Sequence, residues 1–165
     1  MMITLTGFMG SGKTTVGKVL ADFLGCPFMD LDDLVVKKAG KSIPDIFAQD
    51  GEPAFRQLEA QVLRKTVEKY AESTAVLALG GGAVLAPASA ALLHEKTVCI
   101  YLRATLDTLL ARLEGETAGR PLADDALAER LASREPIYEK TAHVIIDTDG
   151  LSPDEVADEI IISAL

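Results

Sequence analysis

The most constraining feature of this chain is a glycine-rich stretch near its start. The pattern G-x-x-x-x-G-K-[ST] is matched at every fixed position by Gly7-Phe8-Met9-Gly10-Ser11-Gly12-Lys13-Thr14. An apolar run of strand length, residues 2–5, precedes the stretch, and apolar residues at helical spacing follow it. Strand, loop and helix in this order are the context in which the pattern forms a phosphate-binding loop. The alternative without function is a glycine-rich turn beside a surface lysine.

The loop also predicts a ligand. Its glycines let several backbone N–H groups point at one phosphate, and the N-terminus of the next helix adds positive potential. Lys13 would reach the β and γ phosphates of a nucleotide, and Thr14 would offer its hydroxyl to Mg²⁺. We therefore expect nucleotide contacts from Gly10, Ser11, Gly12, Lys13, Thr14 and Thr15.

A GTPase switch is disfavoured. Such proteins read guanine through an Asn-Lys-x-Asp motif, and this sequence contains no asparagine. The segment Asp147-Thr148-Asp149-Gly150 matches a loose D-x-x-G pattern, but it follows the last expected strand and opens the last expected helix. A turn and a helix N-cap explain it.

Short apolar runs alternate with helically spaced segments along the whole chain. The runs that read as strands are residues 2–5, 27–29, 75–79, 97–102 and 144–146. Parallel strands need crossover connections, and helices supply them here, so we expect an α/β fold with a parallel sheet covered on both faces.

A length of 165 residues predicts one domain. Two segments depart from the alternation of strands and helices. Residues 31–69 are charge-rich and helical with no strand signal, which indicates a helical insertion packed on the sheet. Residues 114–125 are polar and contain Gly115, Gly119 and Pro121, which is typical of a mobile flap.

Charge and composition exclude several function classes. A formal net charge of -9 disfavours a general affinity for nucleic acid or anionic membranes, since both require cationic patches. The start lacks a basic region and a cleavage site, and the uncharged stretch from Val76 to Leu93 is interrupted by glycine and proline, so we expect neither a signal peptide nor a membrane span. Cys26 and Cys99 read as free thiols, and we expect a cytoplasmic protein.

Acidic and glycine residues follow two of the expected strands. Asp30 and Asp32 come after the second strand, at the sheet edge where ligands bind in open α/β folds. They could serve Mg²⁺ and a hydroxyl nucleophile, or one could cap the next helix beside a solvated neighbour. Gly80, Gly81 and Gly82 end the third strand and remove every Cβ there, which favours close approach of a ligand over a permissive loop.

Three arginines are candidates for binding anions. Arg56 could be oriented by Glu59 three residues on, or the two could form an ordinary exposed ion pair; Arg134 is equally ambiguous. Arg120 lies in the expected flap, where it could reach a transferring phosphoryl group on closure or remain a solvated loop residue. Carboxylates suited to hydroxyls and guanidinium groups suited to a carboxylate together favour a small hydroxylated acid as phosphoryl acceptor.

In order and spacing, these segments resemble those of the shikimate kinases over nearly the whole chain. The segments that carry the resemblance are Gly7 to Lys18, Phe28-Met29-Asp30-Leu31-Asp32, Phe47 to Glu59 with Phe55-Arg56, Leu79-Gly80-Gly81-Gly82-Ala83-Val84, Arg120-Pro121-Leu122, and Arg134 with Pro136 and Tyr138. The resemblance implies a three-layer P-loop kinase fold of the nucleoside-monophosphate-kinase type, with a five-stranded parallel sheet in the order 2-3-1-4-5. It implies transfer of the γ-phosphoryl of ATP to the 3-hydroxyl of shikimate, in aromatic amino acid biosynthesis.

The resemblance also implies roles by position. Lys13, Asp32 and Arg120 match the catalytic residues, and Thr14 and Asp30 match the Mg²⁺ contacts, Asp30 through water. The shikimate contacts correspond to Asp32, Arg56, Arg134 and residues 80–82, with Gly81 matching through its backbone. Arg112 resembles the arginine that packs on adenine, and residues 148–153 resemble the adenine-side loop.

Two residues depart from the family pattern. Leu31 stands between the aspartates where a small polar residue is common, and residues 149–153 lack the arginine often found there. A kinase for another polyhydroxy acid, such as gluconate, and a regulatory module that binds nucleotide without transferring phosphate are the alternatives. We expect the protein to act as a monomer.

Overall fold

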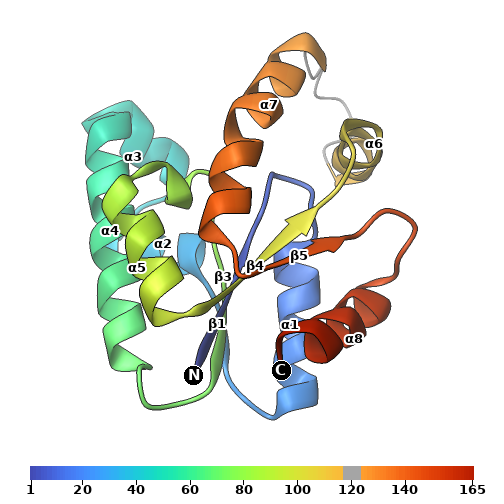
Figure 1. Ribbon diagram of the computed structural model, residues 1–165. Coiled ribbons are helices and arrows are strands. Elements are labelled where there is room, and N and C mark those ends of the chain that lie inside the picture. The colour runs from blue at the N-terminus through green and yellow to red at the C-terminus, as the bar shows by residue number, and fades with distance from the viewer. Residues whose placement is uncertain (117–123) are drawn as a thin grey trace.

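The computed structural model describes residues 1–116 and 124–165 and contains one parallel five-stranded sheet (Figure 1). Its strands are β1 (Met2–Thr6), β2 (Phe28–Asp30), β3 (Ala75–Ala78), β4 (Val98–Arg103) and β5 (Val144–Asp147). They lie in the order β2-β3-β1-β4-β5, and every pair is parallel. The predicted α/β class and strand order are confirmed.

Alternating side chains give the sheet two apolar faces. In β1, Ile3 and Leu5 face the layer formed by α1 (Lys13–Leu24) and α8 (Pro153–Ala164), while Met2 belongs to the core on the other face. The same alternation divides Ile100 from Tyr101 in β4. Since both faces are covered, the strands read as nearly continuous apolar runs.

Residues 31–69 fold into three helices and no strand. These are α2 (Leu31–Ala39), α3 (Ile43–Asp50) and α4 (Glu52–Lys69). Asp30 caps α2 and Ser42 caps α3, each through its side chain, and Gly40 ends α2 with a φ of 72°. The buried residues Leu31 and Val35 anchor α2 to the core, which leaves Asp32 at the carboxyl edge of the sheet.

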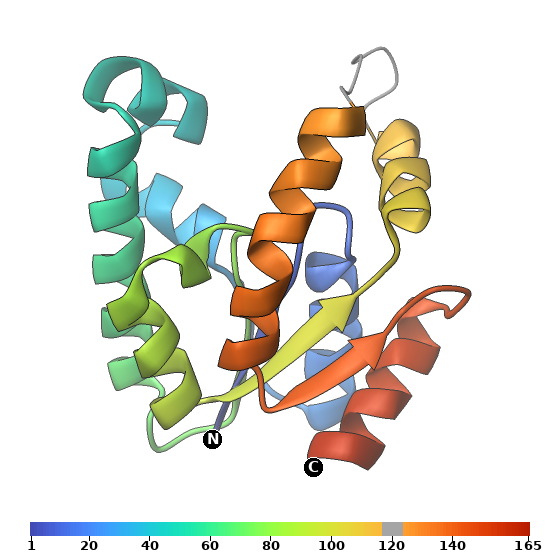
Figure 2. The ribbon, with the colours of Figure 1, turned by 45° about the horizontal axis from the view of Figure 1, so that its top comes forward.

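The remaining elements complete the layer opposite α1 and α8. They are the 3₁₀ turn η1 (Ala83–Leu85), α5 (Pro87–Lys96), α6 (Leu106–Glu116) and α7 (Asp124–Thr141). Figure 2 shows α6 beyond the carboxyl ends of the strands, α7 running along the sheet and past those ends, and both chain ends at the opposite side. The predicted flap is helical at its two edges, and its central residues 117–123 lie outside the described ranges.

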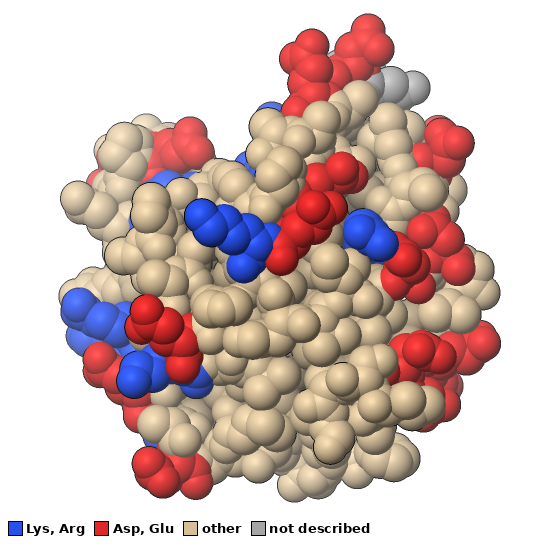
Figure 3. Space-filling model, in the orientation of Figure 1, with Lys and Arg blue, Asp and Glu red and all other residues tan. Residues whose placement is uncertain are grey.

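The uncharged stretch from Val76 to Leu93 forms β3, η1 and part of α5. In the two described ranges, no helix is long and apolar enough to cross a membrane. On the face shown in Figure 3, acidic side chains predominate around the rim, and Lys and Arg form small separate groups. A polyanion would therefore meet repulsion over much of this face.

Candidate active site

The glycine-rich loop joins the carboxyl end of β1 to the N-terminus of α1, as predicted. Gly10 and Gly12 have φ angles of 81° and 92°, which L side chains rarely adopt. At Gly7 a Cβ would lie 2.7 Å from the carbonyl oxygen of Leu102. The buried hydroxyl of Ser11 has no hydrogen-bond partner among the described residues. A loop that only glycine can form, with an unsatisfied donor at a helix N-terminus, is suited to bind an anion.

Lys13 folds back over the loop that carries it. Its Nζ donates to the carbonyl oxygens of Gly7 at 2.7 Å and Phe8 at 3.0 Å. Burial lowers the pKa of Lys13 to about 8, although the nearby carboxylates of Asp32 and Asp30 act in the opposite direction. The amine therefore lies at the loop, and an anion bound there would raise its pKa again.

Asp30 caps the next helix and also contacts the phosphate-binding loop. Its Oδ1 accepts from the backbone N–H of Asp32 at 2.9 Å, which caps α2. Its Oδ2 accepts from the hydroxyl of Thr14 at 2.9 Å. The cap thus fixes the carboxylate while its other oxygen remains beside the Thr14 hydroxyl, and this pair of hard oxygen ligands fits a magnesium ion.

Residues 80–82, which we call the glycine bridge, lie between the phosphate-binding loop and four charged side chains. A Cβ on Gly80 would lie 3.0 Å from Asp32 Oδ1 and 3.2 Å from Glu59 Oε2. A Cβ on Gly81 would lie 3.4 Å from Arg134 Nη1 and 3.6 Å from the carbonyl oxygen of Gly7. Side chains on the bridge would thus fill the space between the phosphate-binding loop and the four charged side chains.

The third glycine of the bridge is required by Arg56. A Cβ on Gly82 would lie 2.5 Å from Nη2 of Arg56 and 2.7 Å from its Cζ, so the guanidinium rests on the backbone. Arg56 also lies over the Phe55 ring, with Cζ 5.1 Å from the centroid. Any larger residue at position 82 would displace the arginine.

The ion pair of Glu59 and Arg56 differs from an ordinary exposed pair, because Glu59 is buried. Arg56 Nη1 donates to Glu59 Oε1 at 2.8 Å, and Glu59 is only 3% exposed. Burial raises the pKa of Glu59, while Arg56 opposes this shift. Its second oxygen, Oε2, has no hydrogen-bond partner among the described residues. A buried acceptor facing the glycine bridge is available to a ligand donor.

Asp32 lies in the first turn of α2, close to Asp30, Lys13 and Arg56. Partial burial raises the pKa of Asp32, and the nearby carboxylate of Asp30 adds to the shift, while Lys13 and Arg56 oppose it. A carboxylate so destabilised gains from a hydroxyl that donates to it.

Arg134 reaches the same space from α7. Its Cζ lies 5.9 Å from the centroid of the Phe8 ring, and Tyr138, one turn further on, donates its hydroxyl proton to the carbonyl oxygen of Gly81. Tyr138 is fully buried and its ring lies 5.0 Å from that of Tyr101. The helix that carries Arg134 is thereby tied to the glycine bridge.

On the other side of the loop, Arg112 connects three segments. Its Nη1 donates to the carbonyl oxygens of Gly10 and Ser11, both at 3.4 Å, and to Thr148 Oγ1 at 3.2 Å. A hollow of about 170 Å³ lies beside it, lined by Gly10, Ser11, Gly12, Thr15, Val16, Arg112, Thr148, Leu151, Pro153 and Val156. Thr15 and the predicted adenine-side loop therefore meet Arg112 around one cavity.

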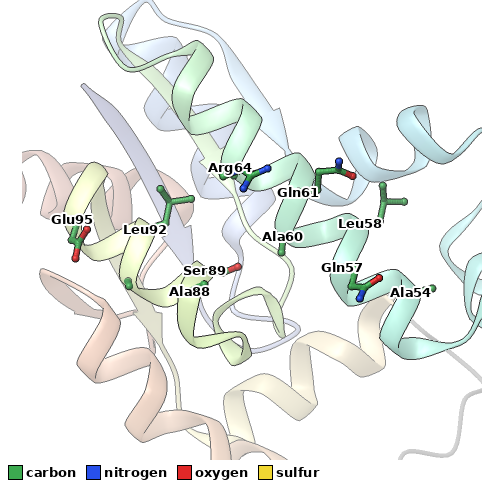
Figure 4. A pocket seen from close by; sticks show the side chains of 11 residues that line it. Ala54, Gln57, Leu58, Ala60, Gln61, Arg64, Ala88, Ser89, Leu92 and Glu95 are labelled. Atoms are coloured by element: carbon green, nitrogen blue, oxygen red, sulfur yellow. The ribbon is translucent and has the colours of Figure 1, made fainter.

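The predicted residues thus fall into two adjoining groups, with one exception. Arg120 lies outside the described residues. A larger hollow of about 920 Å³ lies elsewhere, between α4 and α5 (Figure 4). Its walls carry none of the predicted site residues, and its lining of small and uncharged side chains with Arg64 and Glu95 offers no comparable convergence of charges.

Sequence reasoning missed three features of the site. Phe8 occupies a variable position of the loop pattern, so nothing indicated that its ring lies beneath Arg134. Tyr138 entered only through the family resemblance, without a role. Glu59 was expected to orient Arg56, but its second, unpartnered oxygen could not be foreseen, because its burial depends on how α4 packs.

Loop, sheet order and converging side chains together define a P-loop kinase of small molecules. The shikimate kinase family model matches residues 9–164. Shikimate kinase from Enterococcus faecalis is 43% identical over 164 residues, covering 96% of this chain and 95% of that protein. This chain belongs to the shikimate kinase family, and it is an ATP-dependent kinase.

Solved structures agree with this assignment. Shikimate kinase from Acinetobacter baumannii in complex with shikimate superposes with a TM-score of 0.87 at 34% identity, covering 97% of this chain and 90% of that one. A gluconokinase from Sinorhizobium meliloti superposes with a TM-score of 0.69 at 22% identity, covering 98% and 89%. The second likeness extends to the fold alone.

Proposed function

We propose that this chain transfers the γ-phosphoryl group of ATP to the 3-hydroxyl of shikimate, giving shikimate 3-phosphate. The observation that carries the proposal is the convergence of Asp32, Arg56, Glu59 and Arg134 on the glycine bridge, which itself adjoins the phosphate-binding loop. Two guanidinium groups and two carboxylates suit an acceptor that bears one carboxylate and several hydroxyls.

On the nucleotide side, the loop amides and Lys13 bind the phosphates. Lys13 leaves the carbonyl oxygens of Gly7 and Phe8 to contact the β and γ phosphates, where its positive charge stabilises the charge of the transferring group. Arg112 flanks the hollow beside residues 148–153 and packs on adenine there.

Mg²⁺ is the proposed counterion of the phosphates. Thr14 would hold it through its hydroxyl, and Asp30 would hold it through water, because the two oxygens already lie 2.9 Å apart. Within the described residues, no group of three or more His, Cys, Asp or Glu side chains could hold a metal alone, so the remaining ligands would come from phosphate and water. The ion, when bound, neutralises charge on the β and γ phosphates.

On the acceptor side, the chain orients a hydroxyl for attack. Arg56 and Arg134 bind the carboxylate of shikimate, and Gly81 offers backbone contact. Asp32 accepts a hydrogen bond from the reacting hydroxyl, and its raised pKa makes it a better proton acceptor than an ordinary aspartate. Because a loose transition state needs little general base, positioning is the larger part of this role.

We further propose that the protein acts as a cytoplasmic monomer. Both sides of the site come from one chain. Cys26 and Cys99 are both free thiols, which suits a reducing compartment.

A coupled assay of ADP release with ATP, Mg²⁺ and a panel of hydroxy acids tests the proposal. We expect turnover with shikimate to exceed turnover with gluconate by orders of magnitude. Comparable rates with gluconate would favour the broader polyhydroxy-acid kinase. Slow ADP release with every acid, together with tight ATP binding, would favour a regulatory module.

A further inference from the structure

Asp149 makes contacts that its position in the sequence does not explain. The sequence predicted a turn and a helix N-cap for residues 147–150 as a segment, and the N-cap of α8 is Ser152, which forms a complete capping box with Glu155. Asp149 instead binds the start of a different helix, α6. Asp149 therefore does not cap the helix that follows it.

The Asp149 side chain accepts hydrogen bonds from the first turn of α6 and from the residue just before it. The backbone N–H of Thr105 donates to both carboxylate oxygens, at 3.2 and 3.3 Å, and the hydroxyl of Thr105 donates to Oδ1 at 2.8 Å. The hydroxyl of Thr108 donates to Oδ1 at 2.5 Å, and this bond lowers the pKa of Asp149. A carboxylate at a helix N-terminus also interacts favourably with the helix dipole.

The same face of α6 carries Arg112. Residues 105, 108 and 112 are spaced by three and four, so their side chains share one side of the helix. Arg112 donates to the carbonyl oxygen of Thr148 through Nη2 at 3.2 Å and to the Thr148 hydroxyl through Nη1. Thr148 and Asp149 are consecutive, and together they hold both ends of this helical face.

The helix so held packs directly on the phosphate-binding loop. A Cβ on Gly10 would lie 3.1 Å from Leu113 Cγ and 3.3 Å from the carbonyl oxygen of Leu109, so no side chain fits between α6 and the loop. Thr148, in turn, is buried and bound to the carbonyl oxygen of Arg103 by its backbone N–H at 2.8 Å. A small displacement of α6 would therefore reach Gly10 and Arg112 at once.

We propose that Asp149 is a positioning residue for nucleotide binding. It fixes the N-terminus of α6 and thereby sets Arg112 and the outer wall of the phosphate-binding loop. Asp149 itself touches neither the loop nor the phosphates. This inference rests on the proposed function in one respect, namely that Arg112 and the loop bind the nucleotide.

Two variants of Asp149 separate its charge from its geometry. Asp149→Ala removes every acceptor, so we expect the Kd for ATP, measured by calorimetry without acceptor, to rise about five- to tenfold. Asp149→Asn keeps an acceptor oxygen toward the two threonines and should restore at least half of the lost binding on a logarithmic scale. Neither change should alter the Kd for shikimate by more than about twofold, because neither reaches the acceptor side.

The matched control is Asp147→Ala. Asp147 lies two residues earlier and is also an exposed acid, but its carboxylate pairs with Arg103 in β4, at 2.6 Å and 3.0 Å, and not with α6. We expect its Kd for ATP to remain within about twofold of the wild-type value. Thr108→Val should reproduce part of the Asp149→Ala effect, and the double variant should be no weaker than Asp149→Ala alone.

The results separate three outcomes. An Asp149→Ala protein with a lower melting temperature and an unchanged Kd for ATP would overturn the inference and leave a local stabilising contact. Equal losses in ATP and shikimate affinity would also overturn it, because they would show general damage. A wild-type protein that binds ATP but does not phosphorylate shikimate would defeat the proposed function alone, since calorimetry with ATP still tests Asp149.

Discussion

The proposed nucleotide side and acceptor side of this site differ in the parts of the chain that form them. The phosphate-binding loop is one continuous segment, and the groups that we propose for binding the phosphates are mostly backbone amides and the Lys13 amine. The acceptor side draws single side chains from three helices, with Asp32 from α2, Arg56 from α4 and Arg134 from α7. The glycine bridge lies against both sides, and Arg134 on the acceptor side also lies over the Phe8 ring of the loop. The geometry of the loop depends little on how the helices pack, because the loop is one short segment. The geometry of the acceptor side depends on how three helices pack together.

The comparison predicts that the two sides fail separately. Lys13→Ala should lower kcat at least about a hundredfold while shikimate binding stays within about threefold, because a cation is lost from the transferring phosphoryl group. Lys18→Ala, an exposed lysine on the same helix, is the control and should retain normal kcat. Steady-state assays and shikimate calorimetry measure both quantities. Near-normal turnover of the Lys13 variant would refute the assignment of the loop.

Arg56→Ala should produce the reverse pattern. Loss of a charged hydrogen bond to the carboxylate should weaken shikimate binding by about 1.5–3 kcal/mol, with the Kd for ATP nearly unchanged. Arg64→Ala is the matched control, since Arg64 is exposed on the same helix and lines the hollow between α4 and α5. Titration of each ligand separately decides the matter. Equal losses for both ligands would assign Arg56 to the nucleotide or to folding.

These two sides also differ in how far the sequence predicted them. Lys13 and Thr14 follow from a contiguous pattern whose geometry is local, and the strand order followed from the family resemblance. The sequence placed Asp30 and Asp32 at a sheet edge. It did not predict that one oxygen of Asp30 caps α2 while the other accepts from Thr14. The ion pair of Arg56 and Glu59 stayed ambiguous, because helical spacing does not reveal whether a pair is buried. The contacts of Asp149 with the start of α6 were not predicted, because its partners lie 41 and 44 residues away.

The pH dependence of ATP binding sharpens the comparison further. The free protein holds the pKa of Lys13 at about 8, lowered by burial. Bound phosphates raise it again, so ATP binding takes up a proton above pH 8 and almost none at pH 6.5. The Kd for ATP should therefore rise as the pH rises through 8, by at most about tenfold per pH unit.

Calorimetry in buffers of different ionisation enthalpy measures this proton uptake directly. In Lys13→Met the uptake should vanish, which separates it from protons bound by ATP itself. Shikimate binding should show no matching step near pH 8. Proton uptake that persists in the Lys13 variant would assign the dependence to another group.

The smallest expected effect concerns the one tyrosine that ties α7 to the glycine bridge. Tyr138→Phe keeps the buried ring and its contact with Tyr101, and removes only the hydroxyl that donates to Gly81. The loss should destabilise the protein by about 0.5–1.5 kcal/mol and leave one carbonyl oxygen unpaired. Because Arg134 lies one turn earlier on the same helix, the KM for shikimate should rise about two- to fivefold.

Gly81 also lies close to the phosphate-binding loop, since a Cβ built on it would be 3.6 Å from the carbonyl oxygen of Gly7. The Tyr138→Phe variant therefore also tests whether a change at the glycine bridge affects the nucleotide side. If the two sides are independent, the Kd for ATP stays unchanged in Tyr138→Phe. Tyr70→Phe, at the end of α4 and away from the bridge, controls for the loss of a tyrosine hydroxyl. A Kd for ATP that rises together with the KM for shikimate would mean that the two sides are coupled, either through residues 80–82 or through Arg134, which lies over the Phe8 ring of the loop.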